Sequence, residues 1–156
     1  MLAQACLDAS LDYTSARCQF GKVLREHDLV RREITQMATQ VEAARLLTYR
    51  AASLQDAQQL DAPHATAMAK YCAAQTASKA ANTAIQLHGA NGIGPGNALH
   101  RLLGDARVME LIEGTTQLHE INLAAHVYRQ RARELGALAF RGEAPTSGSH
   151  QAAPPV

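Results

Sequence analysis

Residues 25–59 read REHDLVRREITQMATQVEAARLLTYRAASLQDAQQ, and no glycine or proline interrupts them. Apolar residues recur there at steps of three and four positions, and this spacing places them along one face of an α-helix. The stretch therefore predicts one long amphipathic helix. The residues of its apolar face are Val30, Ile34, Met37, Val41, Ala44, Leu47 and Ala51.

Helical patterns continue on both sides of this stretch. Upstream, residues 2–17 predict a first helix with Leu7 and Leu11 inward, and the helix is expected to end at Phe20-Gly21. Downstream, a break at residues 61–63 ends with Pro63, which suits the first turn of another helix over residues 64–87. That helix is rich in alanine, and small side chains let neighbouring helices approach closely.

The last third of the chain alternates between loop and helix signals. Four glycines and a proline make residues 89–97 a loop. A short helix is expected over residues 98–112 and a final helix over residues 116–139. Residues 113–116 interrupt the pattern between them, and Thr115 or Thr116 is the expected cap of the final helix. One side of that helix holds Leu118, Ile121, Ala125 and Tyr128.

These elements predict an all-α fold. No segment alternates apolar and polar residues for long enough to predict a sheet. Helices with short connections indicate an up-and-down four-helix bundle with a short extra helix, over residues 1–140. Residues 141–156 are rich in Gly, Pro, Ser, Ala and Gln, a composition that predicts a disordered tail.

The composition excludes several classes of function. The 156 residues carry a net charge of +1, with acids and bases mixed along the chain, so we expect no nucleic-acid surface. No apolar run approaches the roughly 20 residues that a membrane span needs. The start of the chain lacks the pattern of a secretory signal. Three widely spaced cysteines predict free thiols in a reducing cytoplasm.

The seven histidines form no metal-binding pattern. No glutamate has a histidine three residues later, as a di-metal carboxylate bundle requires. His119-Glu120 begins like a zinc-protease motif, but Leu123 stands where the second histidine is needed. We therefore expect no metal site.

Three segments carry candidate chemistry, and the first two also have plain structural explanations. Residues 17–22 combine the cation of Arg17, the amide of Gln19 and the ring of Phe20, which suit a phosphate diester and a flat ring. They also suit an ordinary helix end. The glycines of residues 89–96 allow backbone to approach a ligand, or they form a flexible connection. A helix precedes them where a dinucleotide fingerprint requires a strand.

Glu113 is the candidate base in the third segment. A lone glutamate at a helix junction is usually solvated or caps the helix. The flanking residues, among them Leu111, Ile112 and Leu118, are apolar. Desolvation among such residues would make the carboxylate a stronger general base.

Taken together and in this order, the three segments resemble the C-terminal helical domain of the acyl-CoA dehydrogenase family. The signature Arg-x-Gln-Phe-Gly is matched by Arg17 to Gly21. The signature Gln-x-x-Gly-Gly-x-Gly is matched by Gln86, Gly89, Ala90 and Gly92. The signature Arg-Asp-Ala-(Lys/Arg), eight residues before Glu-Gly-Thr-x-Gln, is matched by Asp105 to Arg107 and by Glu113 to Gln117. The resemblance covers the chain up to about Gln130.

The resemblance implies a FAD-dependent oxidoreductase that dehydrogenates an acyl thioester between its α- and β-carbons. Glu113 matches the base that removes the α-proton, and the flavin accepts the hydride. Substrate contacts are implied for Ile112 and Gly114. Contacts with FAD are implied for Arg17, Gln19, Phe20, Gln86, Gly89, Ala90, Thr115 and Gln117.

The resemblance also implies partners. The family shares its cofactor between subunits, so a homodimer or homotetramer is expected. The substrate would be a thioester of coenzyme A or of an acyl carrier protein. The sequence around residues 91–93 and 109–117 is most similar to relatives from antibiotic pathways, some of which act on carrier-bound acyl groups.

Four positions depart from the family pattern. Ala90 replaces the second glycine of the glycine pair, and Gly104 replaces a common arginine. Ile112 replaces an aromatic residue beside the base, which would reshape the thioester pocket. His88 stands where an apolar or aromatic residue is usual.

The family normally has an N-terminal helical domain and a middle β-domain before this bundle. Three explanations stay open: a fragment of a longer chain, one piece of a split enzyme with a separate partner chain, or a relic bundle. Two other functions stay open as well: a non-catalytic helical assembly subunit, and a flavin oxidase or hydroxylase of secondary metabolism. The isolated chain is expected to be inactive without the missing domains.

Overall fold

The computed structural model describes residues 2–140, with side chains through residue 136, and the predicted tail of residues 141–156 lies outside them. The predicted all-α class is confirmed, with one short helix among longer ones. The elements in chain order are α1 (Leu2–Ala16), β1 (Cys18–Gln19), β2 (Lys22–Val23), the 3-10 turn η1 (Leu24–Glu26), α2 (Asp28–Asp56), α3 (Ala62–His88), the 3-10 turn η2 (Gly89–Gly92), α4 (Leu99–Met109) and α5 (Thr116–Phe140).

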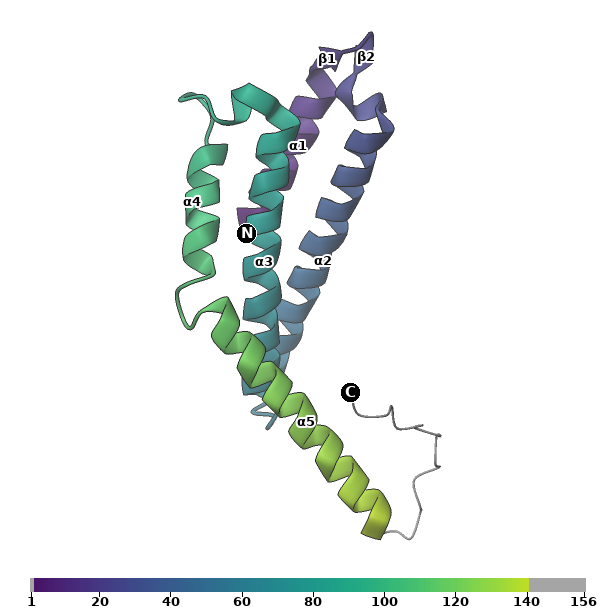
Figure 1. The fold of residues 1–156 in the computed structure, drawn as a ribbon, viewed down its shortest axis with the longest axis vertical. Coiled ribbons are helices and arrows are strands. Elements are labelled where there is room, and N and C mark those ends of the chain that lie inside the picture. Colours follow the sequence, from purple (N-terminus) through teal and green to yellow (C-terminus); the bar gives the residue numbers. More distant parts are fainter. Residues whose placement is uncertain (1, 141–156) are drawn as a thin grey trace, which may run out of the picture.

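Helices α1 to α4 run alternately up and down and pack side by side (Figure 1). Helix α3 is the central element, because α1, α2, α4 and α5 all contact it. Helix α5 contacts α3 near its own start and then continues away from the packed helices (Figure 1). Among the described residues, none of the helices combines the length and apolar character that crossing a membrane requires.

The main core lies where α1 to α4 meet. The predicted stripe of α2 supplies Met37 and Val41, which are 3% and 2% exposed. Four alanines of α3 face them, so these helices approach closely, as their small side chains predicted. Leu99 anchors α4 to the same cluster. The other members are Ala3, Cys6, Leu7, Ala77, Ala80, Ala81, Ala84 and Ala106.

The predicted inner face of α1 is partly wrong. Leu7 is buried as expected, but Leu11 is 42% exposed. Two polar residues take the inward positions instead, because their hydroxyls donate to backbone carbonyls one turn earlier. Ser10 Oγ lies 2.7 Å from Cys6 O, and Thr14 Oγ1 lies 2.7 Å from Ser10 O. Hydroxyls satisfied in this way can be buried at little cost, so a search for apolar spacing overlooks them.

The expectation of no sheet is also wrong, in one small feature. Strands β1 and β2 pair antiparallel, with Cys18 opposite Val23 and Gln19 opposite Lys22. Phe20 and Gly21 form the turn between them at φ values of 53° and 78°. Two consecutive positive φ values are typical of a two-residue hairpin turn. A phenylalanine is unusual at such a position, so the residue types here do not predict a hairpin.

Candidate functional site

Glu113 lies in the turn between α4 and α5. Its φ is 55°, and that of Gly114 is 90°, so the chain reverses through two left-handed residues. The Thr116 amide donates to Glu110 O at 3.0 Å and closes the turn. The Leu118 amide donates to Thr115 Oγ1 at 3.3 Å. Thr115 is therefore the cap of α5, one of the two residues that the sequence proposed.

A pocket of about 270 Å³ lies beside this turn. Its walls are apolar, and the turn itself contributes Ile112 and Glu113. Lys70 supplies the other charged group, and its Nζ donates to Gly114 O at 2.8 Å. Gly114 thus lies next to the pocket without lining it. The remaining lining residues are Leu2, Ala3, Ala73, Ala74, Ala77 and Met109.

The described residues do not desolvate Glu113 as expected. Glu113 is exposed, and so are the apolar residues that flank it. Leu111 is 50% exposed, Ile112 43% and Leu118 49%. These side chains point away from the core, so they cannot enclose the carboxylate unless another surface covers them.

Glu110 is the charged neighbour of the turn with a perturbed pKa. A hydrogen bond from Arg107 holds the pKa of this carboxyl below its ordinary value. Burial acts in the opposite direction, and Ser78 and Lys70 add smaller effects that lower the pKa further. The end of α4 is therefore fixed by an ion pair, three residues before Glu113.

A second pocket, of about 410 Å³, lies at the other end of α3. It brings together the first two candidate segments, which are far apart in the sequence. Six of the residues expected to hold the cofactor line it: Arg17, Gln19, Phe20, Gln86, Gly89 and Ala90. Thr115 and Gln117 line neither pocket; they are exposed at the start of α5.

Several contacts hold the hairpin that presents Arg17 and Phe20. The Leu24 amide donates to Arg17 O at 2.8 Å, and His27 Nε2 donates to Gln19 O at 3.1 Å. The Phe20 ring meets the His27 ring edge-on, with centroids 6.3 Å apart, yet Phe20 remains 93% exposed. A large exposed ring on a fixed turn is available for stacking on a flat ligand.

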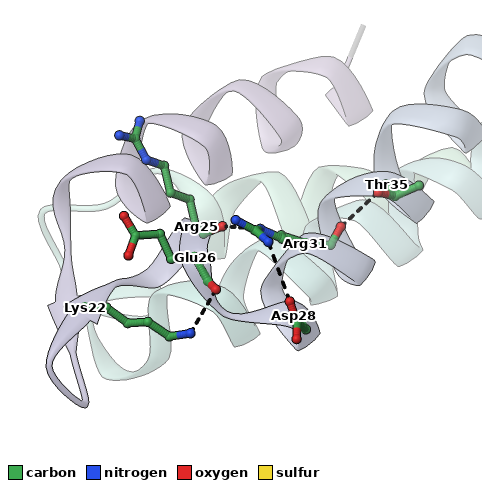
Figure 2. A network of polar contacts seen from close by, with 6 residues as sticks. All are labelled: Lys22, Arg25, Glu26, Asp28, Arg31 and Thr35. Carbon is green, nitrogen blue, oxygen red and sulfur yellow. Dashed lines mark hydrogen bonds and ion pairs between the residues drawn. The ribbon is translucent and has the colours of Figure 1, made fainter.

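Figure 2 shows the polar contacts where the hairpin joins α2. Lys22 Nζ donates to Glu26 O at 3.0 Å, and Arg31 Nε donates to Arg25 O at 3.0 Å. Asp28 lies 3.6 Å from Arg31 as an exposed ion pair. Since these bonds tie η1 to the start of α2, the hairpin is attached to the bundle as a fixed unit.

The glycine loop forms the opposite wall of the second pocket. Gly89 ends α3 at a φ of 59°. Gly92 is buried, and a Cβ there would lie 3.0 Å from the Ile85 backbone, so a larger residue would crowd the loop where it folds back onto α3. His88 stacks on Tyr13 with ring centroids 4.1 Å apart. Asn91 Nδ2 donates to the Tyr13 hydroxyl at 2.8 Å.

Tyr13, Asn91 and Lys70 were missed by reasoning from the sequence. Tyr13 lies one helical turn before Arg17, a spacing that places both on one face, so it was open to prediction. Asn91 lies inside the glycine loop that the sequence did single out. Lys70 comes 44 positions before its acceptor Gly114, and no local sequence pattern predicts that contact.

Comparison with known proteins identifies the family of the chain. Residues 1–128 match the family described as acyl-CoA dehydrogenase, C-terminal domain. The chain belongs to the acyl-CoA dehydrogenase family. Glutaryl-CoA dehydrogenase of Desulfococcus multivorans is 41% identical over 123 residues, which are 79% of this chain and 32% of that relative.

Solved structures are similar as well. The FAD complex of PigA matches with a TM-score of 0.77 at 29% identity, over 80% of this chain and 32% of that one. The prolyl acyl carrier protein oxidase AnaB matches with a TM-score of 0.76 at 25% identity, over 80% of this chain and 33% of that one. The chain therefore spans about a third of the length of these relatives.

Proposed function

We propose that this chain is the C-terminal part of a FAD-dependent enzyme that dehydrogenates an acyl thioester, with Glu113 as the base. The supporting observation is the pocket beside Glu113, in which apolar walls and one candidate base come together. Apolar walls suit the acyl chain and exclude water around it. Ile112 in the wall and Gly114 beside it would contact the substrate.

The proposed step is a proton abstraction next to a carbonyl. The α-proton of a thioester is weakly acidic, so its removal needs a positioned base within hydrogen-bond reach. Glu113 would accept this proton on its carboxylate. Its present exposure means that a further surface has to cover residues 111–118 before the carboxylate becomes a strong base. FAD, when bound, would supply the acceptor for the hydride that leaves the β-carbon.

The residues of the second pocket fit the chemistry of FAD. Arg17 carries a fixed cation, which suits a pyrophosphate, and the exposed ring of Phe20 suits a flat ring. Gly89 and Ala90 present backbone to the same space, and the amides of Gln19 and Gln86 add hydrogen-bonding groups. Thr115 and Gln117, exposed beside Glu113, would contact the cofactor near the reacting centre.

The two pockets lie too far apart to hold the same end of one cofactor molecule. Lys70 and Gln86 are separated by about 24 Å along α3, at about 1.5 Å per residue. The arrangement favours cofactors that are shared between copies of the chain, in a homodimer or homotetramer. The domains that normally precede this bundle would supply the rest of the flavin and thioester sites.

The test of this function is Glu113→Gln in the complete enzyme, with all domains and FAD present. Glutamine keeps the shape of the side chain but cannot accept the proton, so we expect the rate to fall at least about 100-fold. Flavin content, measured by absorbance, should be unchanged. Glu120→Gln is the matched control, since it removes the same charge from an exposed position outside the pocket.

The rival function, a non-catalytic assembly subunit, predicts a different result. A bundle used only for oligomerisation would lose no rate and no flavin on Glu113→Gln. Full activity of that variant, with normal FAD content, would reject Glu113 as the base.

A second candidate function is an oxidase, favoured by the structural likeness to the prolyl acyl carrier protein oxidase AnaB. The same base would act, but reduced flavin would then be reoxidised by oxygen. Turnover of acyl thioesters under air and under argon separates the two reactions. Hydrogen peroxide formed in step with product would indicate the oxidase, and turnover that needs an added electron acceptor would indicate the dehydrogenase.

A further inference from the structure

We infer that Lys70 and His119 are positioning residues, which together hold the Glu113–Gly114 segment in its left-handed conformation beside the apolar pocket. The inference rests on the proposed role of Glu113 as the base. Neither residue belongs to the three sequence motifs, and neither is proposed to contact the substrate. Their effect is on where the Glu113 carboxylate lies.

The Glu113–Gly114 segment needs contacts from other residues to stabilise it, because its backbone is strained. Glu113 has a φ of 55°, a region that side chains other than glycine rarely adopt. Such a conformation persists only where the surroundings enforce it, and it is concentrated at functional sites. The neighbouring Gly114, at 90°, extends the left-handed stretch to two residues.

Two side chains from different helices bind the two consecutive carbonyls of this segment. His119, on α5, donates from Nε2 to Glu113 O at 3.1 Å, since a carbonyl oxygen can only accept. Lys70, on α3, donates from Nζ to Gly114 O at 2.8 Å. Because two neighbouring carbonyls are held from two helices, rotation of the backbone at Glu113 would break at least one bond.

Packing around Gly114 also stabilises the conformation of the Glu113–Gly114 segment. A Cβ at Gly114 would lie 3.3 Å from His119 Nε2 and 3.4 Å from Leu118 Cδ2. The imidazole therefore lies directly against the glycine, and a side chain there would have to push it aside by a few tenths of an ångström. Lys70 lines the same pocket as Glu113, so one contact joins the pocket wall to the turn.

Helix electrostatics do not explain the position of Lys70. Its acceptor, Gly114, lies just before the N-terminus of α5, which starts at Thr116. The N-terminal end of a helix carries partial positive charge and disfavours a cation. The ammonium group is held there by its bond to the Gly114 carbonyl and by attraction to the Glu110 carboxylate, whose pKa Lys70 helps to lower.

The test uses nuclear magnetic resonance on the isotope-labelled full chain and needs no enzymatic activity. Two readouts report on the turn: coupling constants that distinguish positive from negative φ at Glu113, and hydrogen exchange of the Thr116 amide. That amide donates to Glu110 O and closes the turn, so its exchange rate measures how often the turn opens.

Lys70→Met should accelerate exchange of the Thr116 amide at least about tenfold, as expected for the loss of a charged hydrogen bond. It should also shift the Glu113 couplings away from positive φ. His119→Leu should act in the same direction. Lys70→Arg and His119→Gln keep an N–H donor. In these two variants the Glu113 couplings and the Thr116 amide exchange should therefore stay close to those of the unmodified chain.

The matched control is Lys79→Met, which removes the same charge from an exposed position on the same helix. It should change neither readout. Unchanged couplings and exchange in both Lys70→Met and His119→Leu would overturn the inference. Equal acceleration at core amides of α3, such as that of Ala81, would also overturn it, because the residues would then support the whole fold.

Failure of the proposed function would give a different pattern. Glu113→Gln leaves both carbonyl contacts in place, so it should leave the couplings and the Thr116 exchange unchanged. If the complete enzyme keeps its rate with Glu113→Gln while Lys70→Met still opens the turn, the function fails and the positioning stands. In an active enzyme, Lys70→Met should lower kcat at least about tenfold, because the bond that positions the Glu113 turn is lost, and Lys70→Arg should recover most of this rate.

Discussion

Left-handed backbone is found at three non-glycine residues of the described chain: Phe20, Gln58 and Glu113. Two of them are candidate site residues, one in each pocket. Phe20 presents its ring on a hairpin turn, and Glu113 presents its carboxylate between two helices. Strained residues persist where the structure around them fixes the conformation, and both of these have hydrogen bonds on either side. This coincidence supports the two pockets independently of the sequence motifs.

At the same scale, Gly92→Ala should destabilise the chain. The added Cβ would lie 3.0 Å from both Cα and O of Ile85, and these backbone atoms belong to α3 and cannot easily move. We expect a loss of about 1–3 kcal/mol in the free energy of unfolding, as for other overpacked sites. Urea unfolding followed by circular dichroism measures it.

Gly96→Ala is the control for this prediction. It lies in the same loop, has nothing within 4 Å of the added Cβ and has no positive φ. Its effect should be within about 0.5 kcal/mol of zero, or slightly stabilising. Equal losses from the two variants would mean that the loop, and not the contact with Ile85, sets the stability.

Residue types and their order were enough to propose the candidate site residues, but they did not predict which of these residues share a pocket. Arg17 and Gln86 were selected separately, and the structure places them in one pocket. Lys70 was not selected, and His119 was considered only as the start of a zinc-protease motif that Leu123 breaks. Their importance depends on which carbonyls lie opposite them, and that is decided by how α3, α4 and α5 pack.

At the scale of elements, local signals predicted α2 and α3 well. The apolar stripe of α2 is set by helical spacing alone, and Pro63 lies in the first turn of α3 as expected. The stripe of α5 was read correctly as one side of a helix, but Leu118, Ile121 and Tyr128 are 49%, 67% and 78% exposed. Spacing shows which residues share a face and says nothing of what covers that face.

Helix α5 is attached to α3 by its other side. His126 stacks on His64 at a centroid distance of 3.6 Å, and Tyr71 donates to Glu120 at 3.3 Å. From Val127 to Gly136 every residue is exposed. The histidine pair is thus the last contact before the helix leaves the bundle.

The docking of α5 should therefore weaken in acid. The pKa of His64 is lowered from 6.5, first by burial and then by His126, while Asp61 raises it and Arg50 lowers it. His64 therefore binds a proton more readily when α5 is detached than when α5 is docked. Docking is most stable above about pH 6.5, and it weakens as the pH falls below that value. Protection of the α5 amides over residues 119–126, corrected for intrinsic exchange, should fall between pH 7.5 and pH 5.

His126→Phe keeps a stacked ring but removes the imidazole that helps to lower the pKa of His64, so this dependence should shrink. His100→Phe changes an exposed histidine on α4 and should leave the dependence intact. A pH-independent protection in the unmodified chain would show that the histidine pair does not govern docking.

At the scale of the whole molecule, α3 separates two incomplete sites. One end carries the Glu113 carboxylate beside an apolar pocket, and the other carries a cation, an exposed ring and a glycine loop. Neither pocket is enclosed: Glu113 and Phe20 are both exposed, and so is the apolar side of α5. Exposed apolar groups gathered near both pockets are typical of surfaces that another domain or another copy covers.

The chain alone should accordingly show no dehydrogenase activity. A base in water has little advantage over solvent, and an uncovered pocket neither orients the thioester nor excludes water. Purified chain should be colourless and should form no enoyl thioester, even with added FAD and an electron acceptor. Absorbance spectra and mass in solution check the first point, and chromatography of the thioesters checks the second. Stoichiometric flavin in a complex with a second chain would identify that chain as the source of the missing walls, whereas turnover by the chain alone would show that α1 to α5 already form a complete site.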